Sequence, residues 1–263
     1  GVELLVNSPQ FGAAFESRFE LISGKEKGKA LKNLTELALS GILYYISQVL
    51  NHLIENDHFK KGVSKSLKIC LGGKASTLYK IVFEDSDEQE GLSKMIEKVT
   101  GGIFSSISIE FTNTPKHEVS YGLLVDQTGA TDLNIKERSH ETILGEDVLV
   151  GKTNIGIVSK LNVDSEWRIK DISQLKNFLK LLQAYSKIPV KLTKKFEGDL
   201  EGKINAELRN GQARALENAK NQQSIEGDDS IAELQKTSTI VEPVFIQGLK
   251  EIIHNITSGK IKL

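Results

Sequence analysis

The residues whose spacing best fits a chemical role lie in the segment "LKICLGGKASTLYKIVF", residues 67–83. An alternating apolar run stops at Gly72 and Gly73, and Ser76 follows just before a helical pattern begins. Glycine allows a backbone to approach a ligand closely, and the first turn of a helix presents unpaired N–H groups to an anion. Two interpretations remain open: a tight turn, or a binding site for the ribose or phosphate of a nucleotide.

Other groups of residues have a spacing that does not fit a known site. The segment "VGKT" resembles the end of a phosphate-binding loop, but Glu146 stands where that motif needs glycine. The five histidines show no zinc-binding spacing, and no pair of carboxylates stands out as an acid and a base. Cys70 falls inside a predicted strand, where we expect a small buried side chain rather than a nucleophile.

The glycine pair is predicted to lie between a strand and a helix. Leu67, Ile69 and Leu71 alternate with polar residues, as in a short strand, and residues 107–111 repeat that pattern. Between the two strands, "DSDEQEGLSKMIEKVTGG" is typical of a helix that ends on glycines. This order of elements indicates an α/β layer.

Two further helices are predicted around this unit. Residues 29–58 form the longer one, because apolar residues recur there every three or four positions. We expect its core-facing stripe to be Leu31, Leu34, Ala38, Ile42, Tyr45, Val49 and Leu53. A short helix is expected over residues 115–124, where Pro115 suits the first helical turn.

The second half of the chain has a different pattern. Residues 141–169 are rich in β-branched residues and broken by glycine, which predicts two or three short strands. A helix follows a predicted cap at Asp171, and another covers Phe245 to Ile256. Between them, residues 197–237 are mostly polar and predict a thinly packed or partly disordered helix.

Composition limits the classes of function. In 263 residues, 34 Lys and Arg nearly cancel 35 Asp and Glu, so we expect no nucleic-acid or membrane partner. A single cysteine fits a reducing compartment, and neither a spanning segment nor a signal peptide is evident. We therefore expect a cytoplasmic protein. The chain starts on Gly1 within an apolar pattern, which indicates a piece of a longer polypeptide.

The order of a long helix, "ICLGGKAS", a helix, a strand and "TPKHEVSYGLLV" resembles the second lobe of the actin, sugar kinase and heat-shock chaperone ATPase superfamily. The resemblance covers about residues 20–125. In that superfamily a strand that ends in a Gly-Gly-x-x-Ser/Thr turn contacts the adenosine, which implies this role for Gly72, Gly73 and Ser76. A later helix of the form Glu-Val-Ala-x-Gly connects the lobes, and residues 118–122 match it, with Ser120 in place of Ala.

The resemblance also implies ligands and further site residues. In the chaperone branch an upstream helix binds the adenine and ribose, and Glu26, Lys29 and Asn33 have a similar spacing, although Ala30 stands where a stacking Arg is usual. The implied cofactor is ATP or ADP. Its magnesium would be held by residues absent from this chain, because the superfamily's two acidic, glycine-rich phosphate loops are not found here.

The sequence therefore predicts an α/β fold in two parts. Residues 1–128 would form part of an actin-like, ribonuclease H-like ATPase lobe, and residues 129–263 a mixed β and helical region of unknown role. The chain would supply the adenosine side of an ATP site and would not hydrolyse ATP alone; its partner would be the missing N-terminal lobe or another protein. The alternative is a non-enzymatic interaction or assembly module with a degenerate nucleotide site. A third hypothesis, an enzyme that uses scattered carboxylates, has no support from their spacing.

Overall fold

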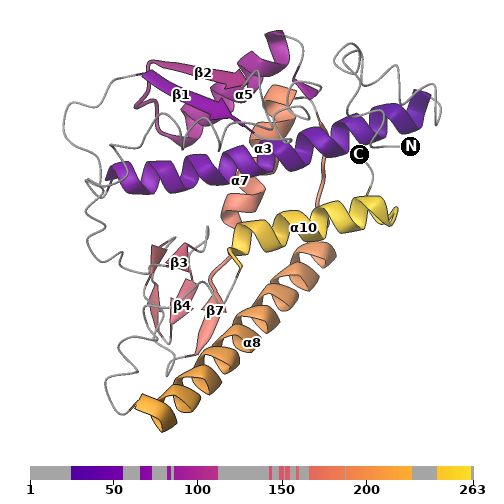
Figure 1. Ribbon diagram of the computed structural model, residues 1–263. Helices are drawn as coiled ribbons and strands as arrows, with labels where there is room; N and C mark the ends of the chain where they lie inside the picture. The colour runs from indigo at the N-terminus through magenta and orange to yellow at the C-terminus, as the bar shows by residue number, and fades with distance from the viewer. Residues whose placement is uncertain are drawn as a thin grey trace.

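The computed structural model of the chain has a mixed α/β fold that is mostly helical (Figure 1). It describes residues 25–55, 66–72, 82–83, 86–111, 142–143, 148–150, 152–154, 158–159, 166–186, 188–226 and 242–261. The helices within these residues are α3 (Lys25–Glu55), α5 (Ser86–Val99), α7 (Ser173–Ser186), α8 (Lys194–Glu226) and α10 (Val244–Thr257). The strands are β1 (Ser66–Leu71), β2 (Ser106–Phe111), β3 (Thr142–Ile143), β4 (Val148–Val150), β5 (Thr153–Asn154), β6 (Val158–Ser159) and β7 (Trp167–Ile169).

The unit β1–α5–β2 confirms the strand, helix and strand predicted around the glycine pair. β1 and β2 pair in parallel, with Ser66 opposite Ser106 and Leu71 opposite Phe111. α5 ends as predicted: the Gly102 N–H donates to the Glu97 carbonyl oxygen at 2.9 Å, and both Gly101 and Gly102 have positive φ. Only glycine adopts such angles without strain, so the pair turns the chain from α5 into β2.

The face of α3 that lies in the core is not the predicted one. The predicted stripe contains Ile42, whose side chain is 44% exposed, and Ile46 beside it is 48% exposed. The opposite face is buried instead and includes Leu37, Ser40, Gly41, Tyr44 and Ser47. Small residues such as Ser40 and Gly41 allow neighbouring helices to approach closely. A prediction based on the spacing of large apolar residues does not include them. The helix prediction is confirmed, and the fully buried face is rotated away from the predicted stripe, of which Tyr45 still packs partly buried against the core.

Three buried aromatic rings join helices that are far apart in the sequence. Tyr44 on α3 lies 5.1 Å from Phe245 on α10 and 5.3 Å from Phe178 on α7, measured between ring centroids. Phe178 and Phe245 meet edge to face at 5.6 Å. These separations fall in the range where aromatic pairs attract one another beyond simple burial. The centre of the core is therefore the meeting point of α3, α7 and α10.

The short strands lie at the other end of the molecule from β1 and β2, as Figure 1 shows. β3 pairs with β6, and β4 lies between β5 and β7 in antiparallel order. α8 covers the edge of β7: the Ile169 N–H donates to Asn205 Oδ1 at 2.9 Å, and the Trp167 N–H to Gln212 Oε1 at 3.3 Å. The side chains of a helix thus bind the strand edge that would otherwise be open to pairing.

The helices of the second half begin and end close to the predicted positions. Asp171 Oδ1 accepts a hydrogen bond from the Ser173 N–H at 2.9 Å at the start of α7. Partial burial of the Asp171 carboxyl opposes its ionisation, but hydrogen bonds from Ser173 and the charges of Lys170 and Lys176 together lower its pKa. Residues 197–237, predicted to be a thinly packed or partly disordered helix, are helical as far as Glu226. The helix predicted over residues 115–124 lies outside the described residues. One hydrophobic cluster spans Leu37 to Ile252, while the division at residue 128 stays a prediction.

A glycine at a helix crossing and an exposed helical glycine together yield a stability prediction. A Cβ on Gly41 of α3 would lie 2.5 Å from Leu249 Cδ2 of α10, whereas a Cβ on Gly202 of α8 would meet no described atom within 4 Å. We expect Gly41→Leu to lower the free energy of unfolding by about 1–3 kcal/mol through overpacking. The matched change Gly202→Leu is expected to raise it by roughly 0.5–1 kcal/mol, because leucine is the better helix former. Urea denaturation of both variants checks this pair, and equal effects would contradict the described packing.

Tyr45 yields a prediction about alkaline stability. Its ring stacks on Phe245 at 6.1 Å, and burial raises the pKa of its hydroxyl from 10.0 to about 12. Because the folded-state pKa is the higher one, this contribution to stability is complete below about pH 10 and is lost as the pH rises through about 12. We expect the urea midpoint of Tyr45→Phe to fall less steeply than that of the wild type between these pH values. Parallel slopes for the two proteins would show that burial does not raise the pKa of Tyr45.

Candidate functional site

The glycine corner predicted from the sequence lies at the carboxyl end of β1. Gly72 follows Leu71 directly and is exposed, while Gly73 and Ser76 lie outside the described residues. Because β1 and β2 are parallel, their carboxyl ends meet at one edge of the sheet. Open α/β sheets bind ligands outside that edge. The described part of the corner therefore lies at the edge where open α/β sheets bind ligands.

Next to the corner, one face of the β1–β2 pair is polar and exposed. On this face Lys68 Nζ lies 2.7 Å from Glu110 Oε1, and the hydrogen bond from Lys68 to Glu110 raises the pKa of the lysine. Cys70 lies on the same face and is exposed, so the prediction of a buried cysteine was wrong. The strand alternates as predicted, but only its leucine and isoleucine face is partly buried, and Cys70 falls on the other face.

The upstream residues implied by the resemblance lie near the start of α3. Lys29 is exposed and Asn33 is half-buried, and Glu26 lies within the same helix. Residues that are three, four and seven positions apart share one face of a helix, so the three define a common stripe. No hydrogen bond or ion pair joins Lys29 or Asn33 to Gly72 within the part of the chain that the structure describes. Residues 118–122 lie outside it.

Two general features bear on the class of site. No group of three or more His, Cys, Asp or Glu side chains that could hold a metal ion occurs within the described residues. None of the helices in those residues is both long and apolar enough to cross a membrane.

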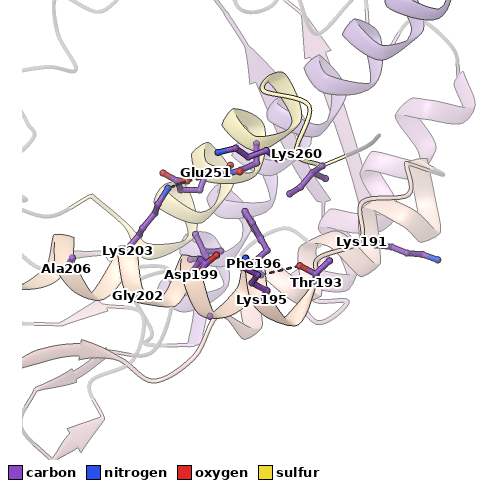
Figure 2. Close-up of a pocket in the computed structure, with 14 residues that line it drawn as sticks. Lys191, Thr193, Lys195, Phe196, Asp199, Gly202, Lys203, Ala206, Glu251 and Lys260 are labelled. Atoms are coloured by element: carbon purple, nitrogen blue, oxygen red, sulfur yellow. Dashed lines mark hydrogen bonds and ion pairs between the residues drawn. The ribbon is translucent and has the colours of Figure 1, made fainter.

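A second site, which the sequence analysis missed, lies between α8 and α10. It is a groove of about 1010 Å³ (Figure 2). On α8 it is lined by Gly198, Gly202 and Ala206, which are all exposed and follow one another at intervals of four residues. On α10 it is lined by Glu251 and by the buried side chain of Asn255. We call this site the α8–α10 groove.

The ends of the two helices shape the groove. Thr193 Oγ1 accepts a hydrogen bond from the Phe196 N–H at 3.2 Å and caps α8, so Phe196 enters the groove from the first turn. At the end of α10 the Lys260 N–H donates to the Asn255 carbonyl oxygen at 2.8 Å, and Gly259 has a positive φ of 74°. This glycine turn reverses the chain and places Lys260 beside the groove. Figure 2 shows Lys260 and Glu251 on one side and Phe196 on the other.

The groove carries an excess of positive charge. Lys191, Lys195, Lys203 and Lys260 line it together with two carboxylates, which leaves two positive charges in excess. Lys203 Nζ lies 2.7 Å from Glu251 Oε2, so this pair neutralises itself and ties α8 to α10. The partial positive charge at the start of α8 adds to the remaining lysines. The groove is therefore suited to an anionic partner.

The one sequence signal for the groove was the spacing of its glycines. In "KLTKKFEGDLEGKINA", residues 191–206, two glycines stand four positions apart inside a predicted helix. Each costs about 1 kcal/mol relative to alanine in a helix interior, so their presence calls for a reason. The α10 wall could not be predicted, because Glu251 and Lys260 are about fifty residues away in the chain.

The geometry thus offers a glycine corner at a parallel sheet edge and a basic groove between two helices. Comparison of this chain with known protein families, with curated proteins and with solved structures found no match.

Proposed function

We propose that this chain supplies the adenosine side of an ATP site in an actin-like or chaperone-like protein and does not hydrolyse ATP alone. The observation that carries the proposal is the exposed Gly72 at the carboxyl edge of the parallel pair β1–β2. A residue without a side chain leaves room for a nucleoside to contact the backbone at this edge. The resemblance adds the exposed Lys29 and the half-buried Asn33 of α3 as further contacts of the same ligand.

The residues present fit a nucleoside better than a complete nucleoside triphosphate. Gly72 offers bare backbone, and Lys29 offers one cation. The sequence contains no pair of acidic, glycine-rich loops of the kind that bind phosphates and magnesium. Under this proposal the magnesium and the γ-phosphate contact a different lobe, and adenosine recognition is the share of this chain.

Thermal unfolding in the presence of nucleotides tests the proposal. With a dissociation constant of about 1 mM, adenosine monophosphate at about 10 mM would stabilise the fold by roughly 1.4 kcal/mol. That corresponds to a rise in Tm of about 3–6 °C for a chain of this size. We expect adenosine monophosphate and ATP to give similar rises, and guanosine monophosphate a smaller one. Gly72→Val and Gly73→Val should abolish the rise, because a branched side chain would occupy the space of the nucleoside.

Controls separate this site from general effects of anions. Gly202→Leu, on α8, should keep the full response to adenosine monophosphate. Inorganic triphosphate alone should give no comparable rise, and phosphate release from ATP should not exceed that of the buffer. A response to triphosphate without adenosine, or steady ATP hydrolysis by this chain, would contradict the proposed division of roles.

A second candidate function is a protein-interaction or assembly module with a degenerate nucleotide site. The exposed apolar side chains of Ile42 and Ile46 on α3 favour it. They stand four residues apart and therefore lie side by side on the helix. If neither adenosine monophosphate nor ATP changes the Tm of the wild type, this second candidate becomes the better explanation of what the chain does.

A further inference from the structure

We infer that the α8–α10 groove is a docking site for a helix of a partner protein, one with small side chains on its contact face and Asp or Glu along its flanks. The inference does not depend on nucleotide binding. It rests on the glycines in the groove, on the size and shape of the groove, and on its charge.

The glycines indicate that something outside the described chain approaches α8. Gly41, Gly91 and Gly248 also lie in helices, and in each case the structure explains the glycine: a Cβ would come within 2.5–3.0 Å of a packed neighbour. Gly198 and Gly202 differ, because a Cβ on either would meet no described atom within 4 Å. Glycine weakens a helix without helping to pack the described residues here. If another chain packs against α8 here, Gly198 and Gly202 have the same role as the other three glycines, which is to leave space for a close neighbour.

The shape of the groove fits a helix. Gly198, Gly202 and Ala206 stand at intervals of four residues, so they form a straight row along α8 about 12 Å long. Two helices approach most closely, to about 8 Å between axes, where the residues in contact are small. Two turns of a helix about 10 Å wide occupy on the order of 900 Å³. The groove measures about 1010 Å³, which is enough for that length of helix.

The charge of the groove selects an acidic helix. Lys203 is neutralised by Glu251 at 2.7 Å, while Lys191, Lys195 and Lys260 line the groove with a single further carboxylate, Asp199. A partner with acidic flanks would meet these lysines at the edges of the groove and place its small residues on the glycine row. Complementary charge of this kind fixes register and suppresses wrong partners.

A small anion fits the groove less well. Pockets for small molecules enclose most of the surface of their ligand. Here the lysines, both glycines and Ala206 are all exposed, so the groove is open along its length. Phe196 at one end is half-buried and offers an apolar contact to a side chain of the partner helix.

The test uses the full chain and a labelled, alanine-rich helical peptide of about twenty residues with glutamates on both flanks of its alanine face. A second peptide has lysines in place of the glutamates. Fluorescence anisotropy should show at least tenfold tighter binding of the glutamate peptide, and affinity should fall with added salt. Ala206→Leu and Gly202→Leu, which fill the row, should each weaken binding at least tenfold.

Ala213→Leu is the matched control. Ala213 is exposed on α8, lies two turns beyond Ala206 and does not line the groove, so its substitution should change affinity less than twofold. The double variant Lys195→Glu, Lys260→Glu should reverse the preference and bind the lysine peptide more tightly.

Several results would overturn the inference. They are equal binding of the two peptides, equal effects of Ala206→Leu and Ala213→Leu, or no binding at about 1 mM peptide. Inorganic triphosphate that binds more tightly than the peptide and is insensitive to Gly202→Leu would identify a small-anion site instead. Self-association of the chain that Ala206→Leu abolishes in sedimentation would identify a second copy as the occupant.

Discussion

The contact among Tyr44, Phe178 and Phe245 is the constraint on which the rest of the structure depends. Each ring comes from a different helix, and about two hundred residues separate the first from the last. α5 packs against both α3 and α7 and connects the β1–β2 pair to this centre, and α8 is attached through α10. Both candidate sites therefore lie on elements whose mutual position is set by one aromatic cluster. Gly41 and Gly248 let the three helices of this cluster approach closely.

Most local elements of this fold could be predicted from the sequence. The alternation of Leu67, Ile69 and Leu71 gave a strand, and the glycines after α5 gave its end, because both signals act over a few neighbouring residues. The buried face of α3 could not be predicted in this way. Its segment "LALSGILYYI" is apolar on nearly all sides, so periodicity does not choose a face, and contact with α10 decides it.

The candidate sites differ in how far the sequence reveals them. The glycine corner is continuous in the chain, and its position after a strand is confirmed at Gly72, while its role with a nucleoside stays a proposal. The α8–α10 groove combines residues 191–206 with residues 251–261, and neither segment has a motif of its own. Its lysines look like an ordinary solvated helix face until Glu251 and Lys260 are brought opposite them. Cys70 shows the same limit, because alternation places it on one face without showing which face is covered.

The hydrogen bonds between β7 and α8 control the solvent exchange of two backbone amides. The amide hydrogens of Trp167 and Ile169 are held by the side chains of Gln212 and Asn205, not by a neighbouring strand. These two amides can exchange with solvent deuterium only when their hydrogen bonds to the α8 side chains open. Their protection factors would therefore report directly how tightly α8 is attached to the small sheet, at two individual backbone positions.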